Sequence, residues 1–240
     1  MGAFIETVND WGTQLIDDTY RNTSLRTKGS ATAVPMPAGG GFIYELYYTT
    51  PAGQEDVWPM CAIYCPNGYA QVKYASKDGA AYHWTVVFQK QDFAPSFEYF
   101  IFQMPAVLAG TGLVVLKDEQ GRVTFDSDEG YLIVREVFST PQNTPGVSRE
   151  YGRKTAFIFS RPGYFNNGVV EYTGEGPHGP RWIFYDDRTI TAVKTSPTGS
   201  CHIRDWGWSG RVFAGEGKAP QGGNYTGGDP IFMAVDVSTL

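Results

Sequence analysis

Short runs of residues that alternate apolar and polar side chains, or that are rich in aromatic rings, fill almost the whole chain. Residues 41–49 and 81–89 are examples, and each run gives way to a turn or to a Gly/Pro-rich loop. Alternation with a period of two is typical of strands with one buried face. Between two such runs, Lys77-Asp78-Gly79 predicts a β-hairpin, because Asp-Gly tolerates the positive φ angles of tight turns. With no convincing helical stretch, the sequence predicts an all-β fold made of β-sandwich-like units.

The composition supports this fold class and limits the classes of partner. The 240 residues include 15 Tyr, 15 Phe, 29 Gly and 15 Pro. Aromatic residues favour half-buried strands, and Gly and Pro supply turns. A net charge of −6 argues against nucleic-acid binding, which needs a basic face. Because no apolar stretch approaches the ~18–20 residues of a membrane span and no secretory signal is seen, we expect folding in a cytoplasm without membrane insertion.

One pattern occurs twice in the chain. Residues 4–25 and 113–134 align when Gly12 is placed on Gly121, which also places acidic residues and apolar residues on their counterparts. Each copy has an apolar strand, a polar turn ending in Gly, a second strand closed by an acidic residue, and a third strand. The repeat therefore predicts two equivalent hairpins.

The polar positions of the repeat predict turn chemistry. Asp10, Gly12 and Gly121 are residue types that favour tight turns and fix the register of a hairpin. Asp17 and Asp126 each follow an apolar strand residue, so we expect their side chains to point outward. Carboxylates at strand ends commonly accept hydrogen bonds from the backbone N–H groups of the next turn. We expect these residues to be structural.

The repeat also suggests how the chain divides. If each copy opens a domain, residues 1–110 form an N-terminal β-domain and residues 111–240 a C-terminal one. The small, flexible residues 109–112 are then the joint. The alternative is one large β-sandwich in which the two copies are equivalent hairpins.

The repeat resembles a recurrent hairpin in tail-tip or tail-fibre-associated proteins of lambda-like siphophages. VNDWGTQLIDDTYRNTSL (8–25) is similar to the opening copy in that family, and VLKDEQGRVTFDS (115–127) to the copy in mid-chain. The resemblance implies a non-enzymatic structural protein of the virion tail, which reaches the virion after folding in the host cytoplasm. It implies other phage tail proteins as partners and supplies no catalytic residues. We expect a homo-oligomer.

A tryptophan-rich segment and the Gly-rich loop after it are the candidates for a specific contact. The residues concerned are Trp206, Trp208, Asn224 and Tyr225. Trp206 and Trp208 are two residues apart and share one strand face, where they could stack on sugar rings, contact a partner subunit, or cover the core. Glycan contact by these residues would make the protein a carbohydrate-binding host-attachment adhesin, which is the rival to the structural role.

Other constellations favour structural interpretations. Cys61, Cys65 and Cys201 are expected to be buried free thiols, because their spacing suits neither a mutual disulfide nor a zinc site. The loop that contains Asp126 fits a calcium loop only in part, so we expect a solvated turn. Asp186-Asp187 is expected to start a type I turn. No catalytic or nucleotide-binding motif is present. We therefore predict no cofactor, no metal and no enzymatic activity, with a glycan hydrolase as the weakest alternative.

Overall fold

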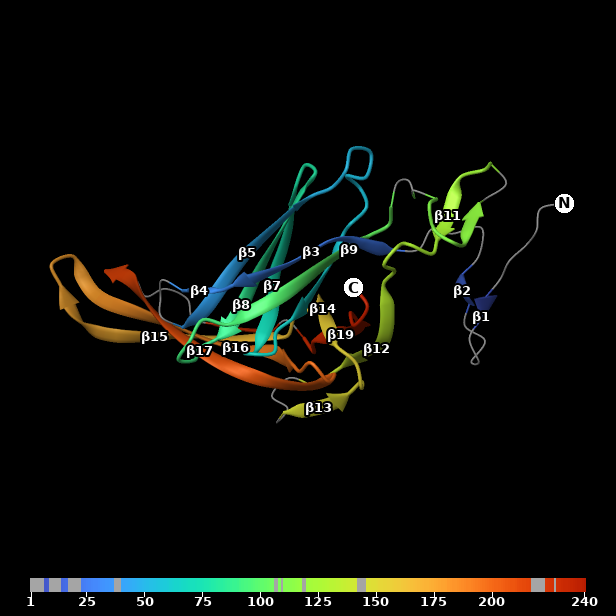
Figure 1. The fold of residues 1–240 in the computed structure, drawn as a ribbon. Helices are drawn as coiled ribbons and strands as arrows, with labels where there is room; N and C mark the ends of the chain where they lie inside the picture. The colour runs from blue at the N-terminus through green and yellow to red at the C-terminus, as the bar shows by residue number, and fades with distance from the viewer. Residues whose placement is uncertain are drawn as a thin grey trace.

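The computed structural model describes residues 7–8, 14–16, 23–36, 40–105, 108, 110–117, 120–141, 146–216, 223–226 and 228–240. Within these ranges all regular secondary structure is β-strand, which confirms the all-β prediction. The strands form two large antiparallel sheets and two small hairpins (Figure 1). Gly79 turns with a φ of 59°, so the hairpin predicted at Lys77-Asp78-Gly79 is present, with Asp78 paired to Ala81.

The first large sheet has six strands in the order β12-β19-β14-β6-β9-β3. Their bounds are β12 Ile133–Ser139, β19 Ile231–Asp236, β14 Thr155–Arg161, β6 Met60–Tyr64, β9 Ser96–Gln103 and β3 Ser24–Thr32.

The second large sheet has nine strands, seven of which follow the order β13-β17-β16-β7-β8-β5-β4. Their bounds are β13 Val147–Glu150, β17 Ser200–Glu216, β16 Gly179–Thr195, β7 Ala70–Asp78, β8 Ala81–Gln89, β5 Gly41–Thr49 and β4 Val34–Pro35. The remaining two strands are β15 (Tyr164–Gly176), which pairs with β16, and β18 (Gly223–Thr226), which pairs with β15.

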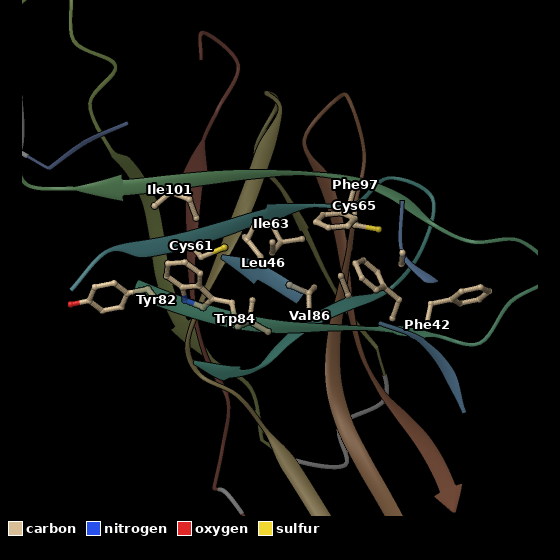
Figure 2. Packing of buried hydrophobic residues seen from close by; sticks show 14 residues of the cluster. Phe42, Leu46, Cys61, Ile63, Cys65, Tyr82, Trp84, Val86, Phe97 and Ile101 are labelled. Atoms are coloured by element: carbon tan, nitrogen blue, oxygen red, sulfur yellow. The ribbon is translucent and has the colours of Figure 1, made fainter. Parts of the chain in front are cut away.

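The two sheets pack face to face and enclose two cores. One core joins residues of β5, β7 and β8 to residues of β6 and β9, and Figure 2 shows Trp84 and Val86 facing Ile63 and Ile101. The other joins β14 and β19 to β16 and β17, with Phe157 and Phe232 fully buried. Each fully buried large apolar side chain contributes about 1.5–3 kcal/mol, so these two cores hold the layers together.

Each sheet divides near its middle into strands from the first and from the second part of the sequence. In the six-stranded sheet, β3, β9 and β6 come from residues 24–103, whereas β14, β19 and β12 come from residues 133–236. The nine-stranded sheet repeats this division, with β5, β8 and β7 on one side and β16, β17 and β13 on the other. One inter-sheet core lies in each half. The halves meet where β6 pairs with β14 and where Ala70 pairs with Val193, so both sheets run across the joint between them.

The sequence repeat is also a structural repeat. In the first hairpin β1 (Thr7–Val8) pairs with β2 (Gln14–Ile16), and in the second β10 (Val115–Lys117) pairs with β11 (Val123–Asp126). Thr7 faces Ile16 just as Leu116 faces Phe125, and both registers then shift at the next residue.

The strand after each hairpin repeats as well. β3 and β12 begin at corresponding positions, and both are edge strands of the six-stranded sheet. The register of β3 shifts around Arg26 and that of β12 around Arg135, which is the corresponding residue. The repeat therefore continues into a bulged edge strand with an arginine at the bulge.

Candidate interaction surfaces on the arm and the hairpins

Three strands are much longer than the others and form a projecting arm. β15, β16 and β17 have 13, 17 and 17 residues, whereas the longest strands elsewhere have 9. At about 3.3 Å per residue, a 17-residue strand is roughly 55 Å long, which exceeds what a two-layer body of this size needs. Figure 1 shows the arm leaving the body at one end, while the two hairpins lie at the opposite end.

The arm exists because β16 is continuous where the sequence predicts a break. The prediction of a turn at Asp186-Asp187 is wrong, since both residues lie inside β16. Asp186 pairs with Gly168 and Gly210, and Asp187 pairs with residues on the same two neighbouring strands. Strands on both sides provide hydrogen-bond partners for the backbone of β16, and this long-range pairing overrides the local turn preference of aspartate.

The base of the arm brings three of the four predicted contact residues together. The cross-strand register gives one row of Tyr225, Asn166, Arg188 and Trp208, running over β18, β15, β16 and β17. The next row contains Asn224, Asn167, Asp187 and Ser209. Successive rows belong to opposite faces of a sheet, so Trp208 and Tyr225 share a face that Asn224 does not. Asn166 and Arg188 were missed as members of this row, because only the pairing of β15 with β16 and β18, and of β16 with β17, brings them beside Tyr225 and Trp208.

Trp206 is buried in a small apolar cluster that is separate from the two inter-sheet cores. Only 7% of it is exposed, and it packs with Met36, Val87 and Ile190. A Cβ atom added at Gly41 would lie 2.9 Å from the Trp206 ring, so the ring covers that glycine. Of the three interpretations of Trp206, ordinary core packing is therefore confirmed, and a ring this buried cannot stack on a sugar.

Apolar residues follow one another along the outer part of the arm. Val170, Phe184 and Val212 occupy one cross-strand row, and Tyr172 pairs with Trp182. Half of the Tyr172 surface is exposed. The register therefore places several apolar residue types on the strands of the arm, with the exposed Tyr172 among them.

The turn residues of the second hairpin behave largely as predicted. Gly121 has a φ of 77°, which suits glycine in the turn. The Asp126 carboxylate accepts hydrogen bonds from the backbone N–H groups of Asp128, Thr111 and Gly112, at 2.9–3.0 Å. The bond from Asp128, followed by the others, holds the pKa of Asp126 below its usual value.

The orientation predicted for Asp126 is wrong. The residue is 1% exposed, because its carboxylate turns back under the loop at residues 111–112. A Cβ atom at Gly112 would lie 2.1 Å from the carboxylate, so only glycine leaves room there. The predicted turn residues Asp10, Gly12 and Asp17 lie outside the described residues.

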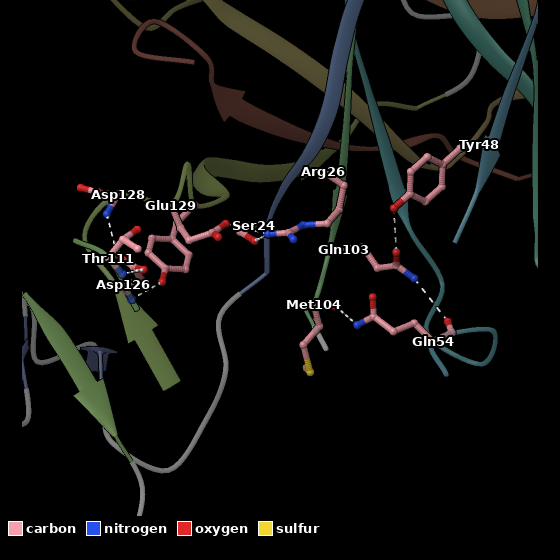
Figure 3. A network of polar contacts seen from close by, with 11 residues as sticks. Ser24, Arg26, Tyr48, Gln54, Gln103, Met104, Thr111, Asp126, Asp128 and Glu129 are labelled. Atoms are coloured by element: carbon pink, nitrogen blue, oxygen red, sulfur yellow. Dashed lines mark hydrogen bonds and ion pairs between the residues drawn. The ribbon is translucent and has the colours of Figure 1, made fainter. Parts of the chain in front are cut away.

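The second hairpin is tied to the first half of the molecule (Figure 3). Arg26 forms an ion pair of 2.6 Å with Glu129, both of them only one-fifth exposed. The backbone N–H of Leu25 donates to Gly130, and that of Leu132 donates to Thr23, at 2.7 and 3.0 Å. The second hairpin therefore belongs to a junction between the two halves.

The cysteines are as predicted. Cys61, Cys65 and Cys201 are all free and buried. Burial raises the pKa of each thiol, to about 12 for Cys65 and Cys201, so the reactive thiolate is suppressed. Among the residues that the structure describes, no group of His, Cys, Asp and Glu side chains is arranged to hold a metal ion.

Comparisons with family models, with curated proteins and with solved structures yield no match to this chain. Within the described ranges, no helix has the length and apolarity that crossing a membrane requires.

Proposed function

We propose that the chain is a non-enzymatic structural protein of a bacteriophage tail, located in the tip or fibre region. The observation that carries this proposal is the duplicated hairpin, because it bears the resemblance to tail proteins of lambda-like siphophages. In its second copy, Gly121 forms a turn and Asp126 forms a carboxylate cap, which are structural tasks. In this proposal the chain acts through contacts with other tail proteins and with further copies of itself.

The arm is the surface that we assign to these contacts. The edges of the body are protected against strand addition, since β4 and β13 are short and β3 and β12 carry a bulge. The bulges hold Arg26 and Arg135, and bulges and charges are devices that discourage edge-to-edge pairing. Partners are therefore expected on the apolar rows of the arm and not along the sheet edges.

Affinity capture tests the proposal. Tagged protein produced during phage infection should retain other tail proteins, and antibody against the chain should label purified virions at the tail. Absence of the chain from virions would contradict the proposal. Release of reducing sugar from host envelopes by the purified chain would also contradict it, because it would show a hydrolase.

The second candidate is a carbohydrate-binding adhesin, which the row of Tyr225, Asn166, Arg188 and Trp208 favours. Tyrosine, tryptophan, asparagine and arginine are residue types suited to stacking on sugars and to bonding to their hydroxyls. If this candidate holds, Trp208→Ala reduces host adsorption while virions still assemble. Trp206→Ala does not test it, because Trp206 is buried.

A further inference from the structure

A small pocket lined mostly by residues with polar side chains lies on the face of the nine-stranded sheet that points away from the core. It has a volume of about 270 Å³ and is formed by β13, the end of β16, the start of β17 and the turn between them. Cys201 and Ile203 point into the core, so the alternate residues of β17 line the outer face. The pocket is separate from the arm rows and from the hairpins.

Two cross-strand rows line the pocket. One row holds Ser148, His202 and Lys194, and the other joins Glu150 to Ser200. Ser196 extends the second row, with its hydroxyl 2.7 Å from that of Ser200. Rows two residues apart on one face lie roughly 6–7 Å from each other, which is the width of a hexose ring.

The chemistry of the lining selects a neutral, hydroxyl-rich group. Glu150 accepts hydrogen bonds and Lys194 donates them, while the serine hydroxyls of the pocket do both. One negative and one positive charge offset each other, so neither an anion nor a cation is favoured overall. A sugar hydroxyl is donor and acceptor at once and matches this mixture.

The wall made by His202 is held in place before any ligand arrives. Its Nδ1 lies 2.7 Å from the hydroxyl of Tyr69, and the guanidinium of Arg204 stacks 4.0 Å from the centre of the Tyr69 ring. Arg204 in turn bonds to Gln89. A Cβ atom at Gly146 would lie 2.3 Å from His202 Nε2, so this glycine leaves the room for the ring. A fixed wall lowers the entropy cost of binding.

We propose that this pocket binds a single neutral sugar residue, as a site distinct from the protein contacts of the arm. A shallow site for one sugar is expected to bind in the millimolar range. The proposal does not depend on the tail assignment, since it rests on the pocket alone.

The test is a titration of the full chain with methyl glycosides of glucose, galactose and N-acetylglucosamine, followed by backbone amide chemical shifts. At least one glycoside should give saturable shifts confined to residues 146–150 and 194–203. The double variant Glu150→Gln/Lys194→Met should bind at least tenfold more weakly.

A matched variant controls for loss of a charge pair. Asp56→Asn/Lys77→Met removes an exposed ion pair of 3.4 Å elsewhere on the surface and should bind like the unaltered chain. Inorganic phosphate is titrated in parallel to detect simple attraction to Lys194. The proposal is overturned by the absence of saturable shifts with all three glycosides, by shifts with phosphate alone, or by equal weakening in both double variants.

Discussion

At the scale of single residues, the most informative groups are two buried ones, Asp126, which was expected to point outward, and Trp206, for which the sequence left core, partner and glycan contacts open. Asp126 follows a strand and has turn neighbours, so its role as a cap was predictable from local chemistry. The burial of Asp126 was not predictable from local chemistry, because the loop at residues 111–112 covers its carboxylate only once the hairpin has folded. The same holds for Trp206, whose cover comes from Met36 and Gly41 on distant segments.

The cap predicts a dependence on pH. Because the pKa of Asp126 is lowered in the folded chain, its stabilising effect is complete above the unfolded value of about 3.9 and is lost as the pH falls through the folded value. The amide signals of Thr111, Gly112 and Asp128 should therefore titrate together below pH ~3.9.

Substitution of the same residue gives a second readout for the cap. Asp126→Asn places an NH₂ group against a backbone N–H group, so the amides of Thr111 and Gly112 should exchange with solvent faster than in the unaltered chain. Asp128→Asn is the control, because Asp128 contributes only its backbone to the cap. Equal exchange in both variants would mean that the carboxylate does not hold the loop.

The buried indole predicts a loss of stability. Trp206→Ala removes a ring that packs on three apolar neighbours and should lower the free energy of unfolding by about 3–5 kcal/mol. Trp58→Ala is the comparison, since Trp58 is 58% exposed and should cost about 1 kcal/mol or less. Denaturant unfolding measures both, and a small loss for Trp206→Ala would place that ring at the surface.

At the scale of elements, strand type was predictable and strand length was not. The alternating runs gave the all-β class and the turn at Gly79, because both depend on neighbouring residues. The arm was missed, because the expected turn at Asp186-Asp187 divides the region of β16 into two shorter strands. Pairing of β16 with β15 and β17 makes them one strand, and no local signal shows that pairing.

If the arm makes the contacts between copies, a substitution on the arm should weaken self-association without unfolding the chain. Phe184→Glu places a charge in the row with Val170 and Val212, and should reduce self-association in sedimentation velocity runs by at least tenfold. The cores of the body are distant from this row, so the thermal midpoint should change by only a few degrees. An unaltered association constant would exclude this row from the contact.

At the scale of the whole molecule, the chain is two related halves that share both sheets. The sequence repeat predicted the hairpins and their equivalence, because turn residues recur at fixed spacing. It did not predict that the halves join edge to edge through β6 and β14, since the strands at that junction carry no recognisable repeat. Lys154 strengthens the junction by bonding to Glu98 across it and lying 4.6 Å from the ring of Tyr64.

The junction predicts that a split chain reassembles. Residues 1–110 and 111–240, produced together as separate fragments, should co-purify, because each half has its own inter-sheet core and exposes a strand edge that the other covers. Lys154→Glu should weaken the association of the fragments by about tenfold, since it opposes Glu98. Fragments that fold but never associate would show that the shared sheets are not needed.

The central claim is that this chain is a structural component of the phage tail that contacts its neighbours through the arm. An electron cryo-microscopy map of the intact virion tail tests it most directly. The account predicts symmetric copies of the two-layer body at the tail tip or fibre attachment region, with β15, β16 and β17 packed against an adjacent subunit. A virion without the chain, or one in which the arm points freely into solvent, would contradict the account.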